Sequence, residues 1–444
     1  MPDDNESTTI RDSLYDRIPL AERDIALIET LEFLRLDRIQ QLGFVSKVWP
    51  GAKHTRFEHS LGVLHLMRRA IASVRRSGSG RSIDDETSRT ATAAALLHDV
   101  GHYPFSHAIE ELGPPILSHE EVGRRLIGRG RIATILAEQW RVDPERVAWF
   151  IRPEGVGEAA DRLLRQLLSG PLDVDKLDYL PRDARHCNVP YGRVDAARLL
   201  GSLRVADVDE QPRIVVSEKG VSPLHSLINA RQEMFDNVYW HHTNRACMVM
   251  LLRAVQEALL AGSLTPDALT LHDDASLLSV LSDSKMPKAT RALVGSLRDR
   301  RLHKRAVEVS ARSEELYRYL GTLYSVPGER RQVEMRMATL LATELEMTVE
   351  PHEILIDIPK PERWSTAVWV WFDRPPVGYQ HLMSWDEVVG LGDEDFKRYE
   401  IHRRMIRIVT TERLREEMSR RWEHLLLPLM SAIGAPDPDP IPHL

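Results

Sequence analysis

Apolar residues recur at helical spacing through most of the first 340 residues. In residues 19–43, Ile25, Ile28, Leu31 and Ile39 lie close to one face of a helix, which predicts a helix over this range. Similar patterns predict helices over residues 59–75, 88–99, 119–128, 159–168 and 222–262. Residues 203–216 alternate around a turn and predict a small β-hairpin. The first 340 residues are therefore expected to be mainly α-helical.

The pattern changes near residue 351. Residues 353–359, 366–372 and 405–411 are rich in β-forming residues, and residues 412–433 have the pattern of an amphipathic helix. The last residues, 434–444, form a Pro-rich tail without helical capacity. We expect a helical domain over residues 10–340, an α+β subdomain over residues 341–433, and the tail over residues 434–444.

Composition narrows the class of protein. The 444 residues carry a net charge of -7, so no global basic field attracts nucleic acid or an anionic membrane. Cys187 and Cys247 have no metal-binding spacing, which argues against disulfides and thiolate metal sites. The N-terminus is acidic and polar, and no apolar run approaches the length of a membrane span. We expect a cytoplasmic protein that has no membrane partner and for which nucleic acid is a disfavoured partner.

Histidines gather in one part of the chain. Six of the 18 fall between His54 and His107, and the stretch ALLHDVGHYPFSH places His98-Asp99 at the end of an apolar helix. Imidazole nitrogen and carboxylate oxygen are common ligands of divalent cations, so this pair is a candidate metal site. A second pair, His272-Asp273 in TLHDDAS, has no apolar helix before it and is expected to be a helix N-terminal cap.

Two other segments carry residues of the same chemistry. His59 opens an amphipathic helix in KHTRFEHSLGVLHL, and LDVDKLDYLPRDAR contains Asp173, Asp175 and Asp178 beside Lys176. Burying several carboxylates in one helix requires a cation or basic partners. The alternative for the second segment is a solvated helix face.

These segments together resemble a known family. His59, His98-Asp99 and Asp175 resemble the H…HD…D signature of the HD-domain metal phosphohydrolases. The strings RFEHSLGV, LLHDVGHYPFSH, SHEE, DVDKLDYLPRDA and ARQEMFDNVYWHHTNR resemble the deoxynucleoside triphosphate (dNTP) triphosphohydrolases, over about residues 10–320. The resemblance implies a mainly α HD-domain helical bundle with a small β-hairpin and a C-terminal α+β appendage. It also implies hydrolysis of a dNTP to a deoxynucleoside and inorganic triphosphate.

The resemblance assigns roles to individual residues. It implies one divalent ion (Fe, Mn, Mg or Zn), and a further Mg²⁺ can accompany the triphosphate. The implied metal ligands are His59, His98, Asp99 and Asp175. The implied catalytic residues are His107, His119, Glu110 and the neighbouring His102. In this assignment His107 donates the proton, Glu110 orients His107, and His119 assists. The implied phosphate ligands are Arg56, Lys176, Tyr179 and Arg231, and the implied sugar contacts are Gln41, Leu42, Asp183 near the 3′-OH, and Tyr239 against C2′.

The sequence departs from regulated members of the family. Their guanine-nucleotide activator binds through positions that here hold Glu29, Leu34 and Asp37. Leucine cannot replace amide contacts and Asp37 would repel phosphate, so we expect this activator site to be absent or rebuilt. The family forms homo-oligomers (dimers, tetramers or hexamers), with residues 366–372 and 412–433 as candidate contact surfaces.

Two alternatives remain open from the sequence. The HD site could act on another nucleotide (a monophosphate, a modified or a cyclic one). The absence of a GYP tripeptide after the HD helix argues against the cyclic substrate. A nucleotide-sensing or single-stranded nucleic-acid-binding oligomer is the other alternative. Against it, the basic stretch ERRQVEMR contains no aromatic residue on which a base could stack.

Overall fold

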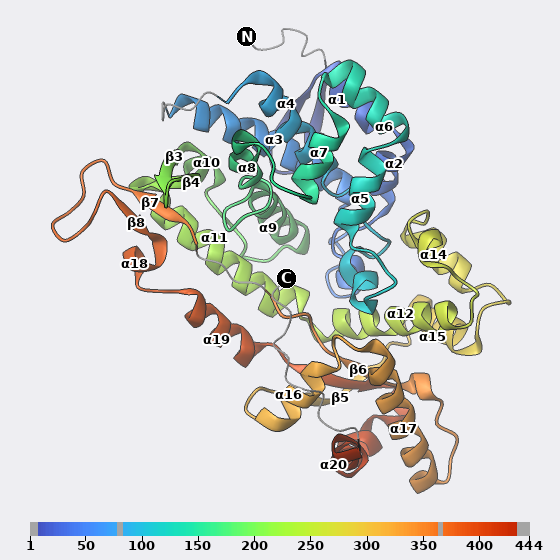
Figure 1. The fold of residues 1–444 in the computed structure, drawn as a ribbon. Helices are drawn as coiled ribbons and strands as arrows, with labels where there is room; N and C mark the ends of the chain where they lie inside the picture. Colours follow the sequence, from blue (N-terminus) through green and yellow to red (C-terminus); the bar gives the residue numbers. More distant parts are fainter. Residues whose placement is uncertain (1–7, 78–82, 363–366, 433–444) are drawn as a thin grey trace.

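The computed structural model describes residues 8–77, 83–362 and 367–432, and the Pro-rich tail lies outside these ranges. The fold is mainly α-helical, as expected (Figure 1). In the described part of the chain, buried apolar residues form three clusters. No helix among the described residues is long and apolar enough to cross a membrane.

The helix predicted over residues 19–43 is broken into short elements. A hairpin of β1 (Thr8–Asp12) and β2 (Asp16–Leu20) precedes α1 (Glu22–Ile28), α2 (Leu31–Leu34) and a 3-10 turn at Arg35–Arg38. Thr30 begins a new helix by accepting a hydrogen bond from the backbone N–H of Phe33. The prediction of one continuous helix was wrong because apolar spacing alone does not reveal this cap.

The first core forms around α3 (Arg56–Arg76), which packs against α4 (Asp85–Leu97) and α9 (Val174–Cys187). These three helices carry the H…HD…D residues. The other helices of this part are α5 (His119–Ile127), α6 (Gly130–Ile135), α7 (Pro144–Ile151), α8 (Ala159–Arg165) and α10 (Ala196–Gly201).

The helix predicted over residues 222–262 is also interrupted. A π-helical turn at Phe235–Tyr239 separates α11 (Val221–Met234) from α12 (His242–Leu260). His241 begins α12, because its Nδ1 accepts a hydrogen bond from the N–H of Thr243. The two helices follow one another across the middle of the molecule, and α12 packs against α15 (Lys288–Arg298) in the second core (Figure 1).

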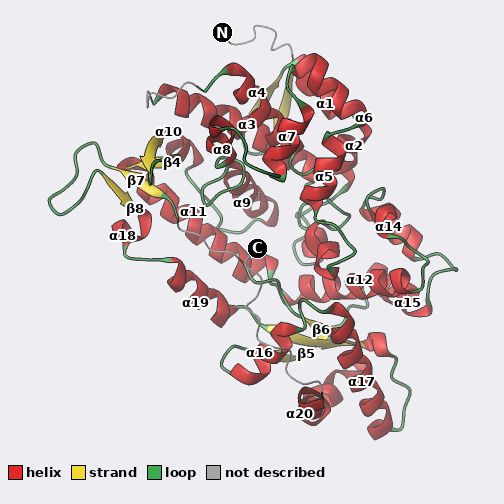
Figure 2. Ribbon diagram, viewed as in Figure 1, coloured by secondary structure: helices red, strands yellow, loops and turns green. Residues whose placement is uncertain are grey.

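The predicted hairpin is present as β3 (Leu203–Val208) and β4 (Gln211–Ser217). It belongs to a sheet of order β3-β4-β7-β8, in which β7 (Trp369–Trp371) runs parallel to β4 and β8 (Leu382–Ser384) pairs with β7. A second sheet of order β5-β9-β6 joins β5 (Lys304–Val309), β9 (Ile406–Thr410) and β6 (Ile354–Asp357) (Figure 2). Strands from both sides of the expected boundary at residue 340 therefore pair in each sheet.

Helices after α12 complete the lower part of the molecule in Figure 1 and the outer side of the sheets. They are α13 (Pro266–Leu269), α14 (Asp274–Leu281), α16 (Glu314–Thr322), α17 (Pro327–Leu345), α18 (Trp385–Val389), α19 (Asp393–Arg403) and α20 (Arg415–Ala432). Glu334 of α17 is fully buried, accepts a hydrogen bond from the N–H of Ile356 in β6 and pairs with Arg253 of α12. This carboxylate connects the second sheet to the central helix.

Candidate metal centre and active site

Three helices bring His59, His98 and Asp175 to one point. His59 is in the first turn of α3, His98 follows the last residue of α4, and Asp175 is in the first turn of α9. One donor atom from each lies within 4.8 Å of the others. His59 Nε2 is 2.9 Å and His98 Nε2 is 3.7 Å from the same oxygen, Asp175 Oδ1.

Asp99 adjoins this group of three donors. Its carboxylate is 3.3 Å from His98 Nε2 and 3.8 Å from His59 Nε2. It also receives a 2.6 Å hydrogen bond from Nη1 of Arg56. Burial opposes ionisation of Asp99, but Arg56 and the neighbouring histidines outweigh it and hold its pKa well below the usual range. Asp99 is therefore an anion beside the other three candidate ligands.

Both histidines are held so that Nε2 faces the common point. Nδ1 of His59 donates to Asp178 at 2.8 Å, and Nδ1 of His98 donates to the carbonyl oxygen of Ala95 at 2.9 Å. His98 Nε2 is buried and has no hydrogen-bond partner among the described residues. Metal-binding histidines are commonly oriented in this way, by a carboxylate or carbonyl on the other ring nitrogen. The donor set and the orphaned nitrogen fit a divalent cation.

Asp178 orients the ring of His59, a role that the sequence did not reveal. Besides His59, its carboxylate binds Arg182 through two 2.8 Å hydrogen bonds and accepts one from the hydroxyl of Tyr15. The three carboxylates of this segment have different surroundings, since Asp173 caps α9 while Asp175 faces the histidines. A solvated helix face is thereby excluded for Asp175 and Asp178.

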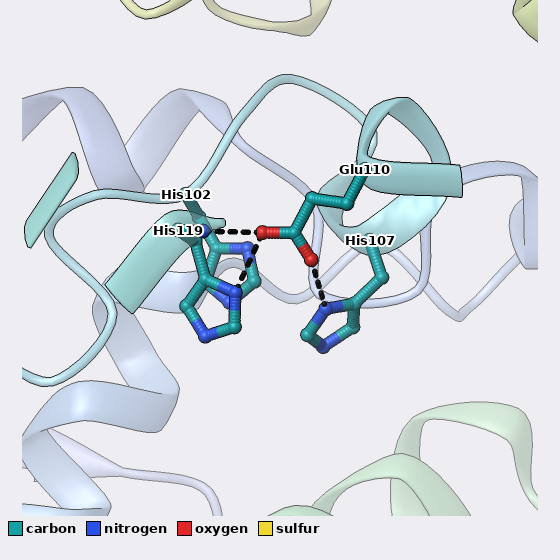
Figure 3. Close-up of side chains that lie close together, drawn as sticks. All are labelled: His102, His107, Glu110 and His119. Carbon is teal, nitrogen blue, oxygen red and sulfur yellow. Dashed lines mark hydrogen bonds and ion pairs between the residues drawn. The ribbon is translucent and has the colours of Figure 1, made fainter. Parts of the chain in front are cut away.

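A second cluster consists of His102, His107, Glu110 and His119 (Figure 3). Glu110 accepts hydrogen bonds from Nδ1 of His107 at 3.2 Å and from Nδ1 of His119 at 2.7 Å. The ring of His102 stacks on that of His119 with 3.8 Å between centroids, and His102 Nε2 is 3.2 Å from Asp99. His102 and Asp99 thus connect this cluster to the first. The four side chains also place donor atoms within 4.8 Å of one another, so they could themselves hold a cation.

The pKa values of His102 and His119 are shifted in opposite directions. Burial, with Arg56 and His119 nearby, lowers the pKa of His102 well below its usual value, so this ring is neutral. Burial acts in the same direction on His119, but Glu110 reverses it and raises the pKa of His119 above 6.5. The His107 side chain is 60% exposed, whereas that of His119 is 14% exposed. The cluster therefore presents an accessible imidazole and a buried one that retains its proton.

Gly101 allows α5 to approach this turn. A Cβ atom at Gly101 would lie 2.2 Å from the carbonyl oxygen of His119 and 2.3 Å from the backbone nitrogen of Gly123. No side chain can be accommodated at that distance from backbone atoms. The glycine of the HDVGH segment thus permits the contact between His102 and His119.

The expected phosphate ligands surround the candidate metal ligands, but they pair with protein groups here. Besides Asp99, Arg56 binds the hydroxyl of Ser106, with Nε 3.0 Å from Oγ. Lys176 Nζ binds Asp173 at 2.5 Å and the carbonyl of Gly170 at 2.9 Å. The other two expected ligands also lie here: the ring of Tyr179 is 6.5 Å from that of His59, and Arg231 pairs with Glu362 at 2.8 Å.

The expected sugar contacts also lie together. The hydroxyl of Tyr239 donates to Asp183 at 2.6 Å, and the other oxygen of Asp183 is 2.7 Å from His54 Nε2. Gln41 donates its backbone N–H to the carbonyl of His54 at 3.0 Å, and Leu42 follows in the same loop. His54 was not among the predicted site residues, although it is the first of the six clustered histidines.

The positions of the expected activator site lie on the surface. Glu29 follows α1, Leu34 ends α2 and Asp37 lies in the following 3-10 turn, and all three are exposed. The absence of a guanine-nucleotide site there stays a prediction.

The second His-Asp pair has the structural role that was expected. Asp273 caps α14 and accepts a 2.8 Å hydrogen bond from the N–H of Ser276, whose hydroxyl in turn accepts from the N–H of Asp273. The cap prediction is confirmed.

Replacing this cap should affect folding and not catalysis. We expect Asp273→Ala to lower the free energy of unfolding by about 1 kcal/mol, because the first turn of α14 loses its hydrogen-bond acceptor. Urea unfolding measures this change. Nucleotide turnover of the folded variant should equal that of the unmodified protein, and a loss of turnover would contradict a purely structural role.

Comparisons with known proteins agree with this geometry. Residues 56–154 match the HD domain and residues 194–370 match the HD associated region. The uncharacterized protein MJ1154 of Methanocaldococcus jannaschii is 34% identical over 277 residues, 62% of this chain and 55% of that protein. Deoxynucleoside triphosphate triphosphohydrolase SAMHD1 of Homo sapiens is 28% identical over 347 residues, 70% of this chain and 54% of that protein. The matches thus span about half the length of these curated relatives.

A solved structure extends the likeness to nearly the whole chain. The crystal structure of a hypothetical protein from Aquifex aeolicus has a TM-score of 0.70 and 26% sequence identity, and the alignment covers 94% of this chain and 99% of that one. The chain therefore contains an HD domain followed by an HD-associated region, and it is similar to the deoxynucleoside triphosphate triphosphohydrolase SAMHD1.

Proposed function

We propose that this protein hydrolyses dNTPs to a deoxynucleoside and inorganic triphosphate. The observation that supports this most is the contact of two clusters with different chemistry. Candidate metal ligands lie on one side of Asp99, and the histidines around Glu110 lie on the other, joined by the 3.2 Å separation of His102 and Asp99. A phosphoryl group placed between the clusters would meet both a metal ion and a proton donor.

In the proposed reaction, water attacks the α-phosphorus and the bond from that phosphorus to the 5′ oxygen breaks. A divalent ion held by His59, His98, Asp99 and Asp175 would supply Lewis-acid polarisation and a more acidic water. The departing 5′ oxygen requires a proton, and His107, accessible and hydrogen-bonded to Glu110, is the proposed donor. His119 shares the same carboxylate and assists by retaining positive charge.

Two cations that already bind carboxylates keep donors for phosphate. Arg56 binds Asp99 through Nη1 and Lys176 binds Asp173. A guanidinium has five N–H donors and an ammonium group has three, so both side chains could contact the triphosphate, with Tyr179 and Arg231, without releasing these carboxylates. Such charge-assisted hydrogen bonds are the strong ones, and arginine can form two in parallel.

Product analysis tests the proposal. The purified protein is incubated with each of the four dNTPs and four NTPs, with Mn²⁺ or Mg²⁺, and the products are resolved. Release of tripolyphosphate and deoxynucleoside is expected. Release of orthophosphate or pyrophosphate alone would contradict it and favour another nucleotide substrate, and a salt-dependent gel shift without turnover would favour nucleic-acid binding.

The remaining proposals follow from the same family. We propose a homo-oligomer in the cytoplasm, without nucleic acid, and a further Mg²⁺ that accompanies the triphosphate. Mass photometry with and without each dNTP measures the oligomeric state, and a monomer under all conditions would contradict the first of these proposals.

Tyr239 should determine the preference for deoxyribose. A hydrogen bond from its hydroxyl to Asp183 holds the ring in place. If the ring packs against C2′ of the sugar, as the resemblance implies, it leaves no room for a 2′-hydroxyl. We expect Tyr239→Ala to lower the ratio of kcat/KM for a dNTP over the matching NTP by about 10- to 100-fold. Tyr239→Phe retains the ring and should retain the ratio. An unchanged ratio in Tyr239→Ala would show that the exclusion is not steric.

A further inference from the structure

His54 lies between Asp183 and the Gln41–Leu42 loop, and both are expected to contact the sugar. Its side chain is completely buried, and its Nε2 lies 2.7 Å from Oδ1 of Asp183 on α9. Its carbonyl oxygen accepts the N–H of Gln41 at 3.0 Å, in the loop that continues to Leu42. One residue therefore touches both the loop and the helix that are expected to contact the sugar.

The hydrogen bonds around Asp183 indicate which ring nitrogen of His54 carries a hydrogen. The two carboxylate oxygens have one partner each: Oδ1 faces His54 and Oδ2 accepts from the hydroxyl of Tyr239. Because the carboxylate can only accept, His54 carries a hydrogen on Nε2 and donates it. Each carboxylate oxygen keeps a lone pair that could accept a second hydrogen bond, from a hydroxyl of the ligand.

The orientation of the His54 ring is fixed from its face. The ring of His186 stacks on it with centroids 4.2 Å apart and 16° between the planes. His186 Nε2 in turn lies 3.5 Å from Oε1 of Glu58 on α3. Locked rotamers of this kind are what hold a binding group in a productive geometry.

We infer that His54 is a positioning residue for sugar recognition, which orients the Asp183 carboxylate toward the 3′-hydroxyl and fixes the Gln41–Leu42 loop on the other side. This inference rests on the proposed function, because the sugar-binding role of Asp183 and of the loop belongs to that proposal. His54 itself acts through Asp183 and Tyr239 and does not take part in bond breaking.

Substrates with and without the 3′-hydroxyl test the inference. We compare kcat and KM for each dNTP and its 2′,3′-dideoxy analogue in the unmodified protein, His54→Leu, His54→Asn and His54→Gln. Leucine removes the donor, asparagine keeps an amide that is too short to reach Asp183, and glutamine carries its amide nitrogen near the position of Nε2. The preference for the dNTP should fall about 10-fold in the Leu and Asn variants and be largely retained in the Gln variant.

A purely structural role predicts a different outcome. If His54 only supported the fold, dNTP and dideoxy analogue would lose the same factor, and this result would overturn the inference. An unmodified protein that does not prefer the 3′-hydroxyl would overturn it too. His402→Leu, an exposed histidine on α19, serves as the control and should leave both substrates unchanged.

Binding separates failure of the inference from failure of the proposed function. The same nucleotide pairs are titrated calorimetrically in Ca²⁺, without turnover. A binding preference for the 3′-hydroxyl that His54→Leu or His54→Asn removes would support the inference even if no dNTP were hydrolysed. Equal preference in these variants and the unmodified protein would overturn it, whatever the reaction.

Discussion

His98→Ala is expected to remove the bound divalent ion and to lower nucleotide turnover by about 1000-fold or more, since metal polarisation contributes several kcal/mol to such reactions. The physical reason is local. His98 Nε2 is buried, has no hydrogen-bond partner in the part of the chain that the structure describes, and lies 3.7 Å from Asp175 and 3.3 Å from Asp99. Alanine leaves the remaining ligands without the donor from α4. Metal content is measured by mass spectrometry of the purified protein, and turnover by tripolyphosphate release.

The chain provides a matched control in its second His-Asp pair. His272→Ala removes the same imidazole beside an aspartate that only caps α14. The hydrogen bond from Arg35 to residue 272 uses the carbonyl oxygen, so the substitution preserves it. Metal content and turnover should stay unchanged in this variant. Retention of the metal in His98→Ala would remove His98 from the ligand set.

Glu110→Gln is expected to lower kcat by about 100-fold and to move the alkaline limb of the pH profile to lower pH. Burial lowers the pKa of His119, and the Glu110 carboxylate 2.7 Å away reverses this and raises it. Without the carboxylate, the largest influence that opposes burial is lost and only the weaker ones of Glu120 and Asp99 remain, so the pKa of His119 should fall. Activity that requires this proton is present below the pKa and lost as the pH rises through it.

Glu120 is a second carboxylate near His119 and provides a weaker substitution for comparison with Glu110→Gln. Glu120 lies 3.6 Å from His119 Nε2, farther than Glu110, and also favours the protonated imidazole. Glu120→Gln should therefore shift the alkaline limb in the same direction by a smaller amount. The measurement is kcat between pH 5 and pH 10 for the three proteins. An alkaline limb that is unmoved by Glu110→Gln would exclude His119 as the group that titrates.

The candidate site could be predicted from the sequence because its residues lie at the ends of helices with recognisable apolar faces. His59 and His98 adjoin the buried faces of α3 and α4, and the resemblance connected them to Asp175. His54 and Asp178 were missed as partners for the opposite reason. Their importance depends on contacts with residues more than 100 positions away, to which no local spacing points.

The positions at which helices break could not be predicted. Thr30 divides the first predicted helix, and a π-helical turn ending at Tyr239 divides another. In both cases the apolar spacing continues through the break, so the pattern of apolar residues does not reveal where the helix is interrupted. The β-rich segments near residues 354, 369 and 406 were predicted, but their partners were not, because strand pairing is decided by packing between distant parts of the chain.

The pairing of the strands has a consequence for truncated forms of the protein. Among the described residues, β5 pairs with β9 in one sheet, and β4 pairs with β7, on the side away from β3, in the other. A polypeptide ending near residue 340 would lack both partners and would expose the backbone groups of two strand edges to solvent. Open edges of this kind template aggregation. Expression of residues 1–340 alone should therefore give insoluble material.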